Sequence, residues 1–281
     1  TLWMTGDDPE ARSLLENVSL ARLQTLVGSH EVVVVDEAQR FANAGLTLKL
    51  ITDHLPQVLL LVTGSSSLDL AAQTKESLTG RKFEFLLFPL SFVEMSGHHG
   101  FLAERSLLEH RMLYGYYPEV VQNEPRQAQK ILNDLTDGLM YKDLLTLDQI
   151  KKPSLLVKLL QALALQVGSE VSYIEVAQLI GADPLTVEKY TDLLEQSFVL
   201  FRLPSLSRNA RNEIKKGRKI YFYDNGIRNS ILKNFSPLAL RNDTGALWEN
   251  FLLAERIKRN AYTDYFCNNY FWRTTTQQEI D

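Results

Sequence analysis

Glu31–Arg40, EVVVVDEAQR, runs four valines directly into two carboxylates. A strand this apolar is typical of a parallel sheet that helices cover on both faces. Its carboxyl end opens at the sheet edge where ligands bind in open α/β folds. There Asp36 can hold Mg²⁺ through water, and Glu37 can orient or deprotonate an attacking water. The alternative is that both carboxylates cap a turn and the helix after it.

Strand and helix patterns alternate throughout residues 1–95. Strand-like stretches cover 1–5, 31–36, 57–67 and 82–91, and helical stretches cover 8–27 and 46–55. This alternation predicts an α/β fold with a parallel sheet. The third strand, QVLLLVTGSSS, ends on Gly64, Ser65 and Ser66, where a polar side chain can touch a γ-phosphate and the attacking water. The alternative is a turn rich in small residues.

The remaining chain predicts three further domains. Residues 96–152 read as a helical subdomain. Residues 153–224 show three helices followed by two strands, the pattern of a winged helix. Residues 225–281 begin another α/β domain with a helix and a strand. The pair His98–His99 has no cysteine or carboxylate at metal-ligand spacing, so we interpret SGHHG as a flexible loop.

Composition favours a cytoplasmic protein with no membrane partner. The 281 residues have a formal charge of −4, and the single cysteine, Cys267, cannot form an internal disulfide, which fits a reducing compartment. No apolar run approaches the ~20 residues that span a bilayer, and no signal peptide is visible. Both ends, TLWMT and QQEID, fall inside strand-like patterns. We therefore expect a piece of a longer chain.

Three stretches together resemble the prokaryotic P-loop ATPases of the AAA+ type: VVVVDEAQR, LLLVTGSSS and LTGRKFEFLLFPLSFVE. The resemblance implies that Asp36 and Glu37 form a Walker B motif with metal and catalytic roles. It implies nucleotide sensing by Ser65 and Ser66, and a phosphate-facing role for Arg81, whose guanidinium suits phosphate. The alternative for Arg81 is a solvated arginine before a strand. Mg²⁺ and ATP are the implied cofactors.

The phosphate-binding loop of this family is absent. No G-x-x-x-x-G-K-[ST] occurs in the 281 residues. In the family this loop precedes the strand that TLWMT resembles, and its own strand lies between those matching VLLLV and KFEFLLF. We therefore expect N-terminal truncation, and an ATPase that is inactive as this chain alone.

The second half resembles the same family over LLEQSFVLFRLPSLSRNARNEIKKGRKIYFYDNGIRNSIL and GALWENFL. There a winged helix leads into a domain of unknown function with a restriction-endonuclease-like fold. Nucleases of that fold bind Mg²⁺ with a helix acid, a strand acid and an E-x-K. Glu249 and Asp281 match the first two positions, and an E-x-K would lie beyond the last residue. The alternative for Glu249 is a solvated helix face, and we interpret YFYDNGIR as structural.

A basic segment falls where the wing of a winged helix would lie. Residues 202–219 contain seven cations and one acid, a net charge of +6. Such a wing can lie along DNA phosphates. Besides Arg202, the candidates are Arg208, Arg211, Lys215, Lys216, Arg218 and Lys219. The third helix, 183–199, has few basic residues, which argues against base readout. Winged helices also bind protein partners.

Three functions remain open. The first is a fragment of an ATP-dependent switch that acts near DNA. The second is a non-enzymatic adaptor with a degenerate ATPase core that binds DNA or protein. The third is a nuclease that the ATPase part regulates.

Overall fold

The computed structural model describes residues 1–64, 78–138, 152–206, 217–273 and 279–280. The chain divides into two compact units, Thr1–Phe85 and Leu86–Asp281. None of the described helices is long and apolar enough to cross a membrane.

The first unit is built on a parallel sheet in the order β1-β2-β3, with β1 Leu2–Thr5, β2 Val32–Asp36 and β3 Leu59–Val62. The helices among its described residues are α1 (Pro9–Leu15), α2 (Leu20–Val27), the short η1 (Ala38–Arg40) and α3 (Ala44–His54). The register places Thr5 beside Asp36, and Val35 beside Val62. The predicted α/β fold with a parallel sheet is confirmed for this unit.

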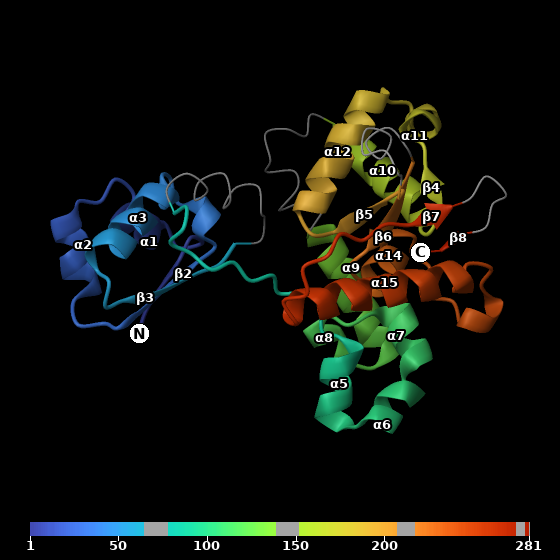
Figure 1. Cartoon of the computed structure of the whole chain (residues 1–281), viewed down its shortest axis with the longest axis horizontal. Helices are drawn as coiled ribbons and strands as arrows, with labels where there is room; N and C mark the ends of the chain where they lie inside the picture. Colours follow the sequence, from blue (N-terminus) through green and yellow to red (C-terminus); the bar gives the residue numbers. More distant parts are fainter. Residues whose placement is uncertain (65–77, 139–151, 207–216, 274–278, 281) are drawn as a thin grey trace. The chain divides into compact units, whose positions relative to one another are not determined.

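The helices α1, α2 and α3 lie on one side of this sheet (Figure 1). Alternate strand residues, such as Met4, Val33 and Val35, pack into the core with them. On the opposite face, Trp3, Leu59 and Leu61 are 64%, 58% and 49% exposed. The prediction that helices cover both faces is not confirmed, because the described helices lie on one side of the sheet. On the other side, Val34 is buried between the exposed Trp3 and Leu61.

The predicted strand 82–91 does not form. Residues 82–90 have no strand hydrogen bonding, and Phe83, Phe85 and Leu87 are almost fully exposed. A strand needs a neighbour to accept and donate its backbone hydrogen bonds, and no described strand lies beside this segment. The predicted helix 8–27 is two helices, because Asn17 has a left-handed φ of 52° and Ser19 caps the second.

The second unit begins with five helices: α5 (Phe92–His99), α6 (Phe101–Ser106), α7 (Leu108–Tyr114), α8 (Pro118–Val121) and α9 (Pro125–Gly138). Three more follow: α10 (Pro153–Leu165), α11 (Tyr173–Ile180) and α12 (Pro184–Gln196). An antiparallel sheet has the order β4-β6-β5, with β4 Glu170–Val171, β5 Leu200–Pro204 and β6 Arg218–Phe222. The unit ends with α14 (Asn225–Ile231), η3 (Leu238–Leu240), α15 (Thr244–Tyr262), β7 (Trp272–Arg273) and β8 (Glu279–Ile280).

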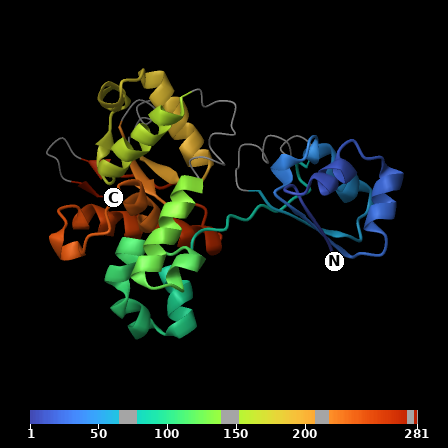
Figure 2. The ribbon, with the colours of Figure 1, turned by 180° about the vertical axis from the view of Figure 1, so that it is seen from behind.

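Helix α14 lies at the centre of the second unit, with other helices around it (Figures 1 and 2). All seven of its residues are buried, although most of them are polar. Its polar side chains donate hydrogen bonds to backbone carbonyls of four different helices. Asn225 reaches Leu247 of α15, Arg228 reaches Ala164 of α10, Asn229 reaches Leu113 of α7, and Ser230 reaches Leu132 of α9.

The β6–α14 turn joins α14 to the loop after α7. The buried carboxylate of Asp224 accepts hydrogen bonds from the backbone N–H groups of Tyr116 at 2.7 Å and Gly226 at 2.8 Å. Gly115 has φ 73°, and a Cβ there would stand 1.9 Å from Oδ1 of Asp224. The helices within 92–138 therefore share their packing with residues after 223.

Candidate functional site

The carboxylate of Asp36 lies between hydroxyls from both neighbouring strands. Thr63, directly after β3, donates to Oδ1 at 2.6 Å. Thr5, the last residue of β1, donates to Oδ2 at 3.4 Å. Because β1, β2 and β3 are parallel and in register, their carboxyl ends deliver these three side chains to one edge of the sheet.

Glu37 begins the turn after β2 in a left-handed conformation, with φ 51°. Its backbone N–H donates to the hydroxyl of Thr63 at 3.2 Å. Its carboxylate accepts from Nε2 of Gln39 at 2.7 Å, and Nε of Arg40 lies 3.8 Å away. Burial raises the pKa of the Glu37 carboxyl above its ordinary value, although Gln39 and Arg40 partly oppose this.

Gly6 lets the chain after β1 approach this turn closely. Its N–H donates to the carbonyl of Asp36 at 2.8 Å. A Cβ at this position would stand 2.3 Å from the carbonyl oxygen of Glu37. Next to it, Asp7 forms an ion pair with Arg40 at 2.6 Å. The turn that holds Glu37 is thus fixed from β1 as well as from β3.

This edge suits a hard cation held through water. The side chains that hydrogen-bond to Asp36 present hydroxyl oxygens, and oxygen is the ligand type that Mg²⁺ prefers. The Asp36 carboxylate is oriented by hydroxyls that leave further lone pairs available. Glu37 is a carboxylate with a raised pKa, which suits a general base.

The other predicted nucleotide contacts are not gathered here. Ser65 and Ser66 lie outside the described residues. Arg81 pairs instead with Asp53 at 3.0 Å. Because Asp53 lies in the last turn of α3, which leads into the start of β3, this pair stands at the other edge of the sheet from Asp36. Sequence reasoning missed Thr63, although it stands in VTGSSS directly before the predicted Gly-Ser turn.

Of the two residues of the predicted second metal site, only Glu249 lies among the described residues. Glu249 accepts a hydrogen bond from the hydroxyl of Tyr221 at 2.5 Å and pairs with Nζ of Lys219 at 3.3 Å. Asp281 lies outside the described residues. Among the described parts of the chain, no three His, Cys, Asp or Glu side chains are grouped to hold a metal.

The described cations of the basic segment are paired with carboxylates. Arg202 donates to Glu195 at 2.7 Å and to Asp192 at 2.6 Å, both on α12. Arg218 lies over the ring of Tyr173 at 4.7 Å from its centroid, and 3.8 Å from Glu188. Four further candidates, Arg208, Arg211, Lys215 and Lys216, lie outside the described residues.

Lys219 does not fit its predicted role in DNA binding. Its side chain is buried, with the residue 2% exposed, and it pairs with Glu249 across the fold. The strand β6 is buried on both faces from Lys219 to Phe222, so the Lys219 side chain does not reach solvent. Counting charges along the sequence could not reveal this burial, because the count does not distinguish buried from exposed residues.

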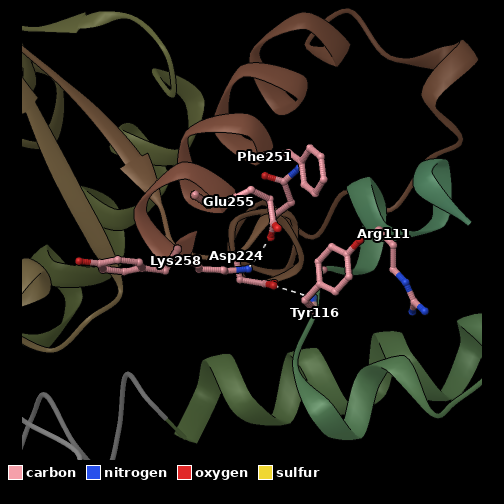
Figure 3. A pocket seen from close by; sticks show the side chains of 10 residues that line it. Arg111, Tyr116, Asp224, Phe251, Glu255 and Lys258 are labelled. Carbon is pink, nitrogen blue, oxygen red and sulfur yellow. Dashed lines mark hydrogen bonds and ion pairs between the residues drawn. The ribbon is translucent and has the colours of Figure 1, made fainter. Parts of the chain in front are cut away.

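A narrow pocket in the second unit is lined by charged groups (Figure 3). Asp224 accepts a hydrogen bond from the backbone N–H of Tyr116. Lys258 donates to Glu255 at 3.0 Å and to the carbonyl of Leu90 at 2.9 Å. The space admits no more than about one water molecule. These side chains hold elements together, in agreement with a structural role for YFYDNGIR.

Two parts of the chain match known protein-family models. Residues 1–96 match the family model of an AAA domain. This match indicates an ATPase-like, nucleotide-binding function for that part of the chain. Residues 105–238 match a domain of unknown function, DUF8612.

The curated relatives are uncharacterised proteins. One from Haemophilus influenzae is 26% identical over 83% of this chain and 58% of its own length. One from Mycobacterium tuberculosis is 26% identical over 91% of this chain and 56% of its own. One from Methanocaldococcus jannaschii is 23% identical over 79% of this chain and 52% of its own. The chain thus spans little more than half of these relatives, and no solved structure matches it.

Proposed function

We propose that the whole protein is a nucleotide-dependent switch that hydrolyses ATP at the edge formed by Asp36 and Glu37. The observation that carries this proposal is the shared contact of both residues with Thr63. That contact orients the carboxylate of Asp36 and fixes the backbone from which the carboxylate of Glu37 projects. The AAA-domain match over residues 1–96 supports the same assignment.

The two carboxylates have different tasks in this proposal. Asp36, oriented by Thr5 and Thr63, holds Mg²⁺ through water. Glu37, oriented by Gln39, accepts a proton from the attacking water. Mg²⁺ supplies charge neutralisation for the phosphoryl group in transfer. Ser65, Ser66 and Arg81 remain proposed nucleotide sensors. Arg81 would have to leave Asp53 to reach a phosphate.

The proposal concerns the whole protein and not these 281 residues alone. They contain no G-x-x-x-x-G-K-[ST] loop, which positions the phosphates in P-loop enzymes. The deciding experiment is ATP turnover by the whole protein and by its Glu37→Gln variant. Equal turnover by both would overturn the assignment.

We further propose a winged helix in residues 153–224. The order of helices and strands and the β4-β6-β5 sheet support it. In this proposal, β5 and β6 flank a basic wing, 207–216, that contacts DNA phosphates. The second candidate is a protein partner. It is favoured by the acids Glu188, Asp192 and Glu195 on α12, because their ion pairs engage Arg202 and Arg218 and make these cations less available to phosphate.

An endonuclease-like fold for residues 225–281 remains a proposal that rests on the sequence resemblance. A nuclease function has less support. Glu249 is engaged by Tyr221 and Lys219, so its carboxylate already has partners within the fold.

A further inference from the structure

The two adjacent histidines at the end of α5 place their Nδ1 atoms close together, with the ring planes 86° apart. Nδ1 of His98 lies 3.5 Å from Nδ1 of His99. On the other side of its ring, His99 places Nε2 2.8 Å from Oε2 of Glu104. The prediction of a flexible loop at SGHHG is wrong for residues 96–99, which belong to α5. The sequence offered no carboxylate at ligand spacing, but the α5–α6 turn brings Glu104 to His99.

Glu104 determines which nitrogen of His99 holds the proton. The residue is fully buried. It also accepts hydrogen bonds from Nε of Arg111 at 2.9 Å and from the hydroxyl of Tyr116 at 2.6 Å. Because Glu104 accepts from these donors as a carboxylate, the proton between it and His99 belongs to Nε2 of His99. In the neutral imidazole ring, Nδ1 therefore carries a lone pair and no proton. That lone pair is on the side of His98.

The spacing of the two Nδ1 atoms fits a shared cation. Two imidazole nitrogens bound tetrahedrally at about 2.0–2.1 Å stand roughly 3.3–3.4 Å apart. The observed 3.5 Å is close to this, whereas it is the upper limit for a hydrogen bond between the rings. Metal-bound histidines commonly donate their other N–H to a carboxylate, as His99 does to Glu104.

We propose that His98 and His99 form a site for a divalent first-row transition metal ion, such as Zn²⁺, with Glu104 orienting His99. Water completes the coordination. Imidazole ligands suit zinc, copper and nickel. The site is accessible, because His98 is exposed, the His99 side chain is 26% exposed, and Gly97 and Gly100 flank the pair. The carbonyl end of α5 also favours a cation.

The test is a Zn²⁺ titration of the metal-free chain by calorimetry at pH 7.5, together with the visible spectrum of bound Co²⁺. We expect one equivalent to bind. His98→Asn and His99→Asn should each weaken binding by at least tenfold, and Glu104→Gln by 10- to 100-fold. The matched control is His54→Asn, on α3, which should bind like the parent. If His54→Asn weakens binding equally, or if no equivalent binds, the site is wrong.

A second measurement does not depend on how the variants fold. Long-range ¹H–¹⁵N NMR of the metal-free protein reports which ring nitrogen holds the proton. We expect His99 to be protonated at Nε2 when neutral, and both Nδ1 signals to shift on addition of Zn²⁺. A neutral His99 protonated at Nδ1, or Zn²⁺ shifts at the Nε2 atoms, would overturn the proposal.

Discussion

The hydroxyl of Thr63 donates to Oδ1 of Asp36 at 2.6 Å and accepts from the N–H of Glu37 at 3.2 Å. One side chain at the end of β3 therefore fixes the orientation of the carboxylate at the end of β2 and of the turn that follows it. If the proposed chemistry is correct, changes at these three residues should have different kinetic consequences.

Glu37→Gln in the whole protein should retain ATP binding and lose turnover by about 100-fold or more, because a general base acts only when the water attacks. Asp36→Asn should also weaken Mg·ATP binding, because a metal ligand acts in the ground state too. Titrations and rate measurements on both variants check this. Normal hydrolysis by Glu37→Gln would mean that the carboxylates only cap the strand.

Thr63→Val should lower turnover by about tenfold, which corresponds to ~1.4 kcal/mol of barrier. The change removes the hydroxyl that orients Asp36 and the acceptor of the Glu37 N–H. Thr63→Ser keeps a hydroxyl and serves as the control, with turnover near that of the parent. Equal rates for the valine and serine variants would show that the hydroxyl has no part in the chemistry.

Gly115→Ala should destabilise the second unit by about 3 kcal/mol or more. A Cβ would stand 1.9 Å from the Asp224 carboxylate, and φ is 73°. The control is Gly245→Ala, near the start of α15, where an added Cβ would meet no atom within 4 Å. This change should leave the free energy of unfolding unchanged or raise it by up to ~1 kcal/mol. Urea unfolding of the two variants makes the comparison. Similar midpoints would contradict the close approach of Gly115 to Asp224.

Stability should fall in acid because of Asp243. Hydrogen bonds from Arg241 and Arg228 lower the pKa of Asp243 to about 2, from an ordinary value of 3.8. A lowered folded-state pKa gives stability that is present above about pH 4 and lost between about pH 4 and 2. The shift corresponds to roughly 2 kcal/mol. The Asp243→Asn variant should therefore have a lower free energy of unfolding than the parent at pH 7. The difference between the two proteins should become smaller near pH 2. A difference in the free energy of unfolding that is independent of pH would show that the ionised Asp243 carboxylate does not stabilise the fold.

DNA binding, if the wing is the contact, should be weak, independent of sequence and steeply reduced by salt. Lys215→Glu with Lys216→Glu should abolish it in fluorescence anisotropy with duplex DNA. The matched control is Arg126→Glu with Lys130→Glu on α9, which makes the same change in charge at exposed positions. Loss of binding in both pairs would indicate only a general charge effect.

The strand β2 and its carboxylates were predictable, because an unbroken apolar run ending in Asp36 and Glu37 is a local signal. The part played by Thr63 was not, because its contact with Asp36 joins residues 27 apart. For the same reason, the hydrogen bond from Tyr116 to Glu104 and the burial of Lys219 could not be predicted, because they depend on tertiary packing and not on the local pattern. The strand prediction for 82–91 failed because periodicity reports how a segment could pair, and not whether a partner is present.

The central position of α14 has a consequence for synthesis on the ribosome. The four helices that it joins by hydrogen bonds include α7, α9 and α10, which precede it in the chain. At ~5–20 residues per second, several seconds pass between the emergence of α9 and that of α14. During this delay the apolar faces of the earlier helices have no central helix to pack on. The nascent chain in that interval is a natural client for chaperones, and slow translation there would prolong its exposure.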